Sequence, residues 1–294
     1  MKNYELEPAW YYTAPGLAWD ACLKKTGVQL ELLSDPDMLL MVEEGIRGGI
    51  SMISNRYAKA NNPYMGDKYN PDEPNKYITY LDANNLYGWA MSKPLPTGNF
   101  KWMKKFDNWY KLPQGKGCIL EVDLEYPLEL HDLHNDLPLA PEKIKVNKVE
   151  KLIPNLQDKT NYVIHHETLK LYTSLGLKIK RIHRGVEFSE SPWLKQYIDL
   201  NTGLRSKATN NFEKDFFKLM NNSVFGKTIE SLRKRRDFRL VNNKKSLKKL
   251  VAKPNFGHLT IFDENLVSVH MKKNKISHEQ TCLFGNEYSR LGKS

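Results

Sequence analysis

Two helical segments joined by a short loop constrain the fold of this chain more than any other feature of its sequence. Pro192 opens the first segment, which runs to about residue 207, and the second segment covers residues 212–232. Proline is favoured in the first turn of a helix, and helical periodicity continues through both segments. The sequence therefore predicts a helical hairpin whose loop lies near residues 208–211.

The second helix of this hairpin has two different faces. Four residues fall within about 80° of one another on a helical wheel, namely Lys214, Lys218, Asn222 and Phe225. The opposite side is predicted to face the core and carries Phe212, Phe216, Leu219, Met220 and Ser223. Two lysines one turn apart, followed by an amide, a ring and Gly226, suit a nucleoside triphosphate laid along the helix. Taken alone, the pattern is that of an amphipathic helix with a basic edge.

Helix and strand signals are mixed along the rest of the chain and predict one continuous α+β body without repeats. Helices are predicted at residues 18–25 before Gly27, at residues 38–44 behind an Asp35-Pro36-Asp37 cap, and at residues 165–175. Strands are predicted at residues 77–81, 117–126 and 178–188.

Two groups of residues have spacings that a metal site could use. Glu121, Asp123 and Glu125 share one face of a predicted strand, where a solvated face is favoured over a metal site. Residues 131–136 (HDLHND) have an HxxHxD spacing, but no third anchoring motif is near, so a structural turn is favoured. No metal ligand is assigned to either group.

The charge of the chain favours a polyanionic partner. Lys and Arg number 45 against 34 Asp and Glu, which leaves a formal net charge of +11. Residues 233–236 (RKRR) and four lysines within residues 244–249 crowd the C-terminal third, where phosphate contact and a solvated helix face are equally good interpretations.

Cysteine usage and hydropathy exclude several classes of protein. The three cysteines are far apart and form no CxxC pair, so we predict neither a disulfide framework nor a zinc knuckle. No apolar run approaches the roughly 18 residues of a membrane span, and no signal peptide is recognisable. A nuclear or cytoplasmic protein without a membrane partner is therefore expected.

The second helix also carries a known motif. The spacing Lys218-x3-Asn222-Ser223-x-Phe225-Gly226 resembles motif B of family B DNA polymerases, KxxxNSxYG, with Phe225 in place of the usual tyrosine. The resemblance implies a set of residues that bind the incoming nucleotide. This set comprises Lys207, Lys214, Lys218, Asn222, Phe225 and Gly226.

Residues 82–88 (DANNLYG) resemble motif A of the same family, DxxSLYP. The resemblance implies that Asp82 is the first catalytic, metal-binding carboxylate and that Tyr87 blocks a ribose 2′-hydroxyl. Asn85 and Gly88 stand where Ser and Pro are usual, and they match the protein-primed branch found in Polinton (Maverick) elements. Residues 12–21, 47–51 and 216–223 resemble the same branch.

Gly48 and Gly49 resemble the (Y)xGG/A element that contacts template, although Ile46 replaces its tyrosine. Together with the basic run, the resemblance implies a set of DNA-binding residues. This set comprises Arg47, Gly48, Gly49, Ser223, Arg233, Lys234, Arg235 and Arg236.

The resemblance implies an incomplete family B polymerase fold, an α+β palm of antiparallel sheet and helices with helical-hairpin fingers. Residues 1–76 lead into the palm, 77–190 form the palm with motif A and a protein-primed-type insertion, 191–240 form the fingers, and 241–276 begin the post-fingers region. Residues 277–294 are predicted to be an out-of-frame tail, because a shifted reading frame can encode a stretch that resembles the one before motif C.

The function implied is DNA-templated DNA synthesis, with Mg²⁺ in a two-ion site and with template-primer DNA, deoxynucleoside triphosphates and a terminal priming protein as partners. The second carboxylate motif of such enzymes contains Asp-x-Asp, and no Asp-x-Asp follows Gly226. We therefore expect this chain to be inactive alone. The alternative is a non-catalytic DNA- and nucleotide-binding remnant, and metal-dependent nuclease action is a more distant one.

Overall fold

The computed structural model describes residues 3–230 and 237–272, which belong to two compact units. The larger unit includes the chain up to Ile229, and the smaller unit begins at Glu230. Buried hydrophobic clusters form within each unit. The described part of the chain contains no helix that combines the length and hydropathy required to cross a bilayer.

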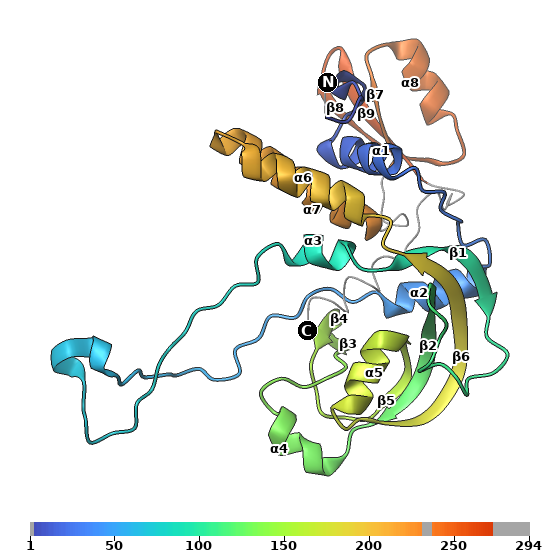
Figure 1. The fold of residues 1–294 in the computed structure, drawn as a ribbon. Coiled ribbons are helices and arrows are strands. Elements are labelled where there is room, and N and C mark those ends of the chain that lie inside the picture. The colour runs from blue at the N-terminus through green and yellow to red at the C-terminus, as the bar shows by residue number, and fades with distance from the viewer. Residues whose placement is uncertain (1–2, 231–236, 273–294) are drawn as a thin grey trace. The chain divides into compact units, whose positions relative to one another are not determined.

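The larger unit begins with a 3-10 turn, η1 (Pro8–Trp10), and two capped helices, α1 (Ala14–Thr26) and α2 (Pro36–Gly45) (Figure 1). α1 ends at Gly27, whose φ of 60° lies in the left-handed region that glycine adopts without a Cβ clash. α2 begins behind Asp35, whose carboxylate accepts hydrogen bonds from two N–H groups of the first turn. Both predicted helices are confirmed, and α1 starts at Ala14 rather than residue 18.

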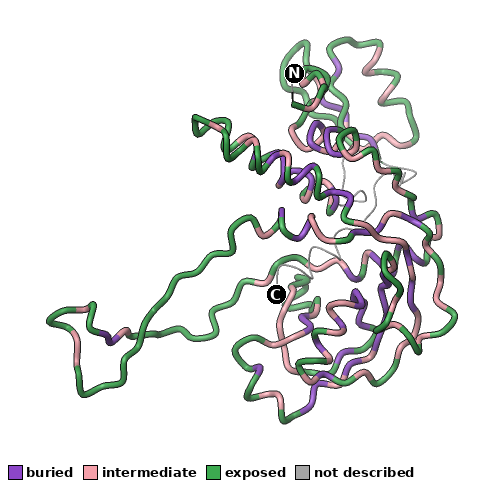
Figure 2. The backbone as a smooth tube through the Cα atoms, in the orientation of Figure 1, coloured by how far each residue is buried: buried purple, intermediate pink, exposed green. Residues whose placement is uncertain are grey.

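A long connection, residues 46–85, joins α2 to the short helix α3 (Leu86–Met91) and contains one 3-10 segment, η2 (Pro63–Lys68). Most of its residues are exposed (Figure 2). The strand predicted at residues 77–81 is not formed, so this prediction is wrong. A strand satisfies its backbone groups by pairing with a neighbour, and in the described part of the chain residues 77–81 have no pairing partner.

A four-stranded antiparallel sheet is the centre of the larger unit. Its order is β1 (Leu95–Trp102), β6 (Lys178–Ser191), β2 (Lys116–Glu125) and β5 (Lys159–His165), and the hairpin of β3 (Glu142–Val146) and β4 (Val149–Ile153) lies between β2 and β5 in sequence. The predicted strands at residues 117–126 and 178–188 correspond to β2 and β6 and are confirmed.

Helices cover both faces of this sheet. α2 packs with Ile119, Val163 and Val186 on one face, whereas α5 (His166–Ser174) packs with Leu120 and Ile164 on the other. Side chains of a strand alternate between its two faces, so neighbouring residues of β2 and β5 enter different cores. The helix predicted at residues 165–175 is α5 and is confirmed.

The three carboxylates of β2 lie beside basic side chains of β6. Glu121 is buried and pairs with Arg184, Asp123 lies 2.9 Å from His183 Nε2, and Glu125 lies 3.8 Å from Lys178 Nζ. The backbone N–H of Asn161 and the His183 ring lower the pKa of Asp123. Cross-strand ion pairing, rather than plain solvation, is therefore the environment of this face.

The predicted helical hairpin is formed by α6 (Lys195–Lys207) and α7 (Asn211–Thr228). α6 begins three residues after Pro192, and α7 ends at Thr228 rather than at residue 232. The side chain of Asn210 accepts a hydrogen bond from the N–H of Glu213, which explains where α7 starts.

The described residues of the smaller unit form a three-stranded antiparallel sheet and one helix. Its strands are β7 (Asp237–Val241), β9 (Leu266–Met271) and β8 (Phe256–Asp263) in that order, and α8 (Lys244–Val251) packs on it through Leu247 and Leu250. The four lysines of α8 are exposed.

Asp35 allows a test of how α2 is attached to the sheet. Its second oxygen accepts a hydrogen bond from Trp102 Nε1 at 2.9 Å, and this bond, followed by those from the N–H groups of Met38 and Asp37, lowers its pKa. A lowered carboxyl pKa contributes stability above the unfolded value of about 3.9 and loses it as pH falls through the folded value. We expect Asp35→Asn to lower the Tm near pH 7, and the difference from wild type to shrink below about pH 4.

Thermal unfolding followed by circular dichroism across this pH range provides the measurement. Asp37→Asn, in the same helical turn but without a bond to Trp102, is the control and should show a smaller difference. Parallel pH profiles for Asp35→Asn and wild type would contradict the role of the Asp35 charge.

Candidate functional site

The orientation of α7 is set by the core that it shares with α1 and α6. Met220 and Val224 are buried there with Leu194, the N-cap of α6, and with Tyr197 of α6. The predicted core face is partly wrong, because Phe212 and Leu219 are 79% and 49% exposed whereas Phe217 and Asn221 are buried. Two neighbouring helices, rather than one, determine which stripe of α7 is covered.

The hairpin borders a pocket of about 330 Å³ in which three cations converge. Lys214 and Lys218 reach it from α7, and Arg205 reaches it from α6. Among the described residues, none of the three has an acidic partner. Like charges that line one pocket repel one another, and a polyanion relieves that repulsion. The pocket therefore suits a ligand with several phosphate groups.

Neutral polar residues complete the lining. Sequence reasoning missed most of the residues that line this pocket, whether neutral or charged. The residues that it did not assign to a site are Asn85, Thr202, Arg205, Ser206 and Asn221. The sequence did contain a signal for the residues of the hairpin, because they form one stripe on each of its two helices. Residues 202, 205 and 206 share one face of α6, and residues 214, 218 and 221 share one face of α7.

Asn85 enters the pocket from the segment before α3. It has φ 55° and ψ 38°, a left-handed conformation that asparagine tolerates better than most residues. A Cβ on Gly88 would lie 2.4 Å from Asn85 Nδ2, so glycine is required for this approach. These contacts give a structural reason for Asn and Gly at the two positions where the motif usually has Ser and Pro.

An aromatic pair lies next to the pocket. The rings of Tyr87 and Phe225 are stacked, with centroids 4.3 Å apart and planes inclined by 19°. Tyr87 follows Asn85 by two residues, and Phe225 follows Asn221 by about one helical turn. The structure thus brings together Tyr87, which was predicted to select the sugar, and Phe225 of the motif B resemblance.

Asp82 lies three residues before Asn85 and is exposed. Among residues 3–230 and 237–272, no three His, Cys, Asp or Glu side chains gather where they could hold a metal ion. The described residues therefore do not make the predicted two-ion site, and Asp82 stands as a single carboxylate.

The predicted template-contacting element follows α2. Arg47 Nη1 donates hydrogen bonds to the carbonyls of Val163 and Gly45, at 2.7 and 3.2 Å, and its guanidinium lies 3.8 Å from the Tyr162 ring centroid. Arg47 thus attaches the end of α2 to β5. Gly48 and Gly49 are exposed, and a Cβ on either would meet nothing within 4 Å.

The remaining predicted site residues lie away from the pocket lining. Lys207 is exposed at the end of α6, Asn222 is partly buried, Ser223 is buried, and Gly226 is exposed. Arg233, Lys234, Arg235 and Arg236 fall outside the described residues, as do residues 277–294.

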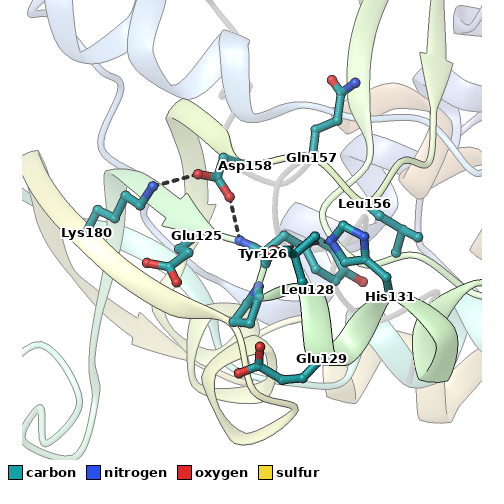
Figure 3. A pocket seen from close by; sticks show the side chains of 10 residues that line it. Glu125, Tyr126, Leu128, Glu129, His131, Leu156, Gln157, Asp158 and Lys180 are labelled. Atoms are coloured by element: carbon teal, nitrogen blue, oxygen red, sulfur yellow. Dashed lines mark hydrogen bonds and ion pairs between the residues drawn. The ribbon is translucent and has the colours of Figure 1, made fainter.

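A second pocket, of about 610 Å³, lies by the end of β2 (Figure 3). Its Asp158 accepts hydrogen bonds from Lys180 Nζ at 2.6 Å and from the Tyr126 N–H at 2.8 Å. The two histidines of residues 131–136 both contact Tyr126: His134 Nδ1 lies 2.8 Å from its hydroxyl, and His131 Nε2 lies 3.3 Å from its carbonyl. These groups are engaged with one another, so the smaller, cation-lined pocket is the better candidate site.

A family model described as DNA polymerase type B, organellar and viral, matches residues 56–286 of this chain. The match includes Asp82, the hairpin and all residues that line the smaller pocket. It also includes residues 277–286 of the segment predicted to be out of frame. The comparison with curated proteins gives no match.

The fold is similar to that of Phi29 DNA polymerase. The complex of that enzyme with primer-template DNA aligns with a TM-score of 0.59 and 14% identity over 96% of this chain. The ternary complex with primer-template DNA and incoming nucleotide substrates gives 0.57 and 16% over 97%. This chain covers 44% and 45% of those chains, less than half. The predicted fold, an incomplete α+β palm with helical-hairpin fingers, agrees with this likeness.

Arg205 and Lys207 allow a test of the pocket, since two cations two residues apart differ in whether they line it. We expect Arg205→Ala to weaken binding of inorganic tripolyphosphate by roughly tenfold, because a hydrogen bond to a charged group contributes about 1.5–3 kcal/mol. Lys207→Ala removes the same charge and should change the affinity less than about threefold. Isothermal titration calorimetry measures both, and equal losses would contradict the assignment of Arg205.

Proposed function

This chain belongs to the organellar and viral type B DNA polymerases, and on that premise we propose that its pocket binds the triphosphate of a deoxynucleotide during DNA-templated DNA synthesis. The convergence of Lys214, Lys218 and Arg205 on one pocket carries the proposal. Ammonium and guanidinium groups are the side chains that recognise phosphate. The Phi29 complexes, named for primer-template DNA and nucleotide substrates, support the same partners for this chain.

The stacked rings suit the sugar and base of that nucleotide. With the triphosphate against the cations, the deoxyribose would meet Tyr87, and the base would meet the aromatic surface that Phe225 shares with it. Tyr87 then excludes a 2′-hydroxyl by contact. Lys207, Asn222 and Gly226, at which the motif B resemblance implies nucleotide contacts, do not line the pocket, so we propose no contact between them and the triphosphate.

The DNA contacts belong to the same proposal. Gly48 and Gly49 present bare backbone to a template, and Arg233, Lys234, Arg235 and Arg236 supply phosphate contacts. Arg47 and Ser223 remain assigned from the resemblance. The DxNNLYG form of motif A favours the Polinton-like, protein-primed branch, for which a terminal protein is the priming partner.

Mg²⁺ is the cofactor that the family implies, and Asp82 is the proposed first carboxylate. The described residues do not fit a two-ion site, because Asp82 is exposed and no group of three potential ligands forms. We propose that this chain binds DNA and nucleotide, whereas catalysis requires a second carboxylate strand. A non-catalytic binding remnant is the alternative.

Equilibrium DNA binding and primer extension, measured side by side on the 294-residue chain, test this function. We expect binding to single-stranded or primed DNA with little sequence preference and a log–log salt slope of about −0.7 to −0.9 per phosphate contact. Extension should remain at background, since a single carboxylate cannot hold two ions. Replacing Arg233, Lys234, Arg235 and Arg236 with Gln should flatten the slope.

The matched control removes the same charge from lysines that already pair with carboxylates. These are Lys24, Lys170, Lys180 and Lys195. Their replacement with Gln should leave the slope nearly unchanged. Affinity that does not depend on salt would contradict the DNA-binding proposal, and robust extension would overturn the requirement for a second carboxylate strand.

Tyr87 and Lys218 separate sugar selection from triphosphate binding. In a protein that also supplies the second carboxylate strand, we expect Tyr87→Ala to admit ribonucleotides while deoxynucleotide incorporation remains measurable. Lys218→Ala should weaken the use of both kinds of nucleotide by a similar factor, because its partner is the triphosphate. Incorporation kinetics with paired deoxy- and ribonucleotides give both ratios. Unaltered discrimination in Tyr87→Ala would show that the assignment of Tyr87 is wrong.

A further inference from the structure

Two adjacent asparagines of α7 have different environments. Asn221 is 5% exposed and borders the cation-lined pocket, whereas Asn222 is partly buried and does not line it. Motif B places its asparagine at Asn222, so the sequence gives no role to Asn221. The structure indicates the opposite assignment, because Asn221, which the motif leaves out, is the residue that lines the pocket.

Asn221 is held from behind by a chain of hydrogen bonds. Its Oδ1 accepts a bond of 2.8 Å from Nδ2 of Asn201, a residue of α6 that is 0% exposed. Asn201 Oδ1 in turn accepts a bond of 2.5 Å from the hydroxyl of Tyr4. Burial raises the pKa of Tyr4, so its hydroxyl keeps its proton and remains a donor at neutral pH. The relay therefore runs from the N-terminal segment through α6 to α7.

The relay leaves the NH₂ group of Asn221, a residue that lines the pocket, without a partner among the described residues. A side-chain amide has one acceptor oxygen and one donor NH₂ group. Because Oδ1 of Asn221 is used by Asn201, its Nδ2 group is available, and no described residue accepts from it. This donor belongs to a side chain that is 5% exposed, and the three cations of the pocket cannot be its partners, since ammonium and guanidinium groups cannot accept. The complementary partner is an anionic oxygen from a ligand.

We propose that Asn221 donates a hydrogen bond to a phosphate oxygen of the bound triphosphate, and that Asn201 and Tyr4 are positioning residues that fix its orientation. This inference rests on the proposed function of the pocket. It adds a neutral, directional contact to the three cations, and it makes the N-terminal segment part of the nucleotide site.

Asn221→Asp tests the contact while preserving the shape of the side chain. The carboxylate still accepts from Asn201, but it replaces the NH₂ donor with a negatively charged acceptor. Asn222→Asp is the matched control, since it adds the same charge one residue along. We expect Asn221→Asp to weaken binding of inorganic tripolyphosphate and of a deoxynucleoside triphosphate by tenfold or more, and Asn222→Asp to weaken either by less than about threefold.

The positioning role of Tyr4 is tested by comparing the effect of one substitution in two backgrounds. Tyr4→Phe removes one hydroxyl and should weaken triphosphate binding severalfold when Asn221 is present. In an Asn221→Ser background, where no amide remains to be oriented, Tyr4→Phe should have little further effect. A loss of equal size in both backgrounds would assign Tyr4 a general structural role and overturn its part in the relay.

Calorimetry on the full 294-residue chain, with circular dichroism to verify folding, separates the outcomes. If Lys218→Ala abolishes binding while Asn221→Asp and Asn222→Asp behave alike, the inference fails and the proposed function stands. If Asn221→Asp weakens the deoxynucleotide but not tripolyphosphate, the phosphate contact is wrong. If wild type binds neither probe, the proposed function fails together with the inference.

Discussion

The packing of α7 against α1 and α6 is the interaction on which the rest of the site depends. Leu194, Tyr197, Met220 and Val224 are buried in that contact, and the Tyr197 hydroxyl donates to the Met220 carbonyl at 3.2 Å. Burial of each large apolar side chain contributes about 1.5–3 kcal/mol. Repulsion between like charges at i and i+4 costs only about 0.2–0.5 kcal/mol. The core therefore determines how α7 is rotated about its own axis. Lys214 and Lys218 keep the positions that this rotation gives them, despite their mutual repulsion.

Local signals predicted much of this architecture. The Asp35 cap, the left-handed Gly27 and the alternation in β2 and β6 act over a few residues, so each could be recognised without knowing its neighbours. The hairpin was predicted for the same reason. The helical wheel also identified Lys214 and Lys218, because helical geometry alone places residues four apart on one face.

Features that depend on a distant partner could not be predicted in this way. Residues 77–81 have a β-prone sequence, yet a strand exists only where another strand pairs with it, and none does in the described part of the chain. The buried stripe of α7 was misplaced because two helices cover it from different sides. Arg205 was missed because its stripe on α6 has meaning only when it faces the corresponding stripe of α7.

In the proposed site, the charged and the neutral groups of the pocket have different roles. A lysine ammonium is a strongly hydrated point charge on a flexible stem, so it attracts phosphate without specifying where each oxygen lies. A side-chain amide whose oxygen is already bonded is fixed in orientation, and its two N–H donors then point in directions set by the plane of the amide. Asn221 is such a group, and its orientation depends on Asn201 and on Tyr4, which is distant from it in the sequence. On the proposed function, affinity follows from exposed charge, whereas the placement of the ligand follows from a buried network that only the folded chain assembles.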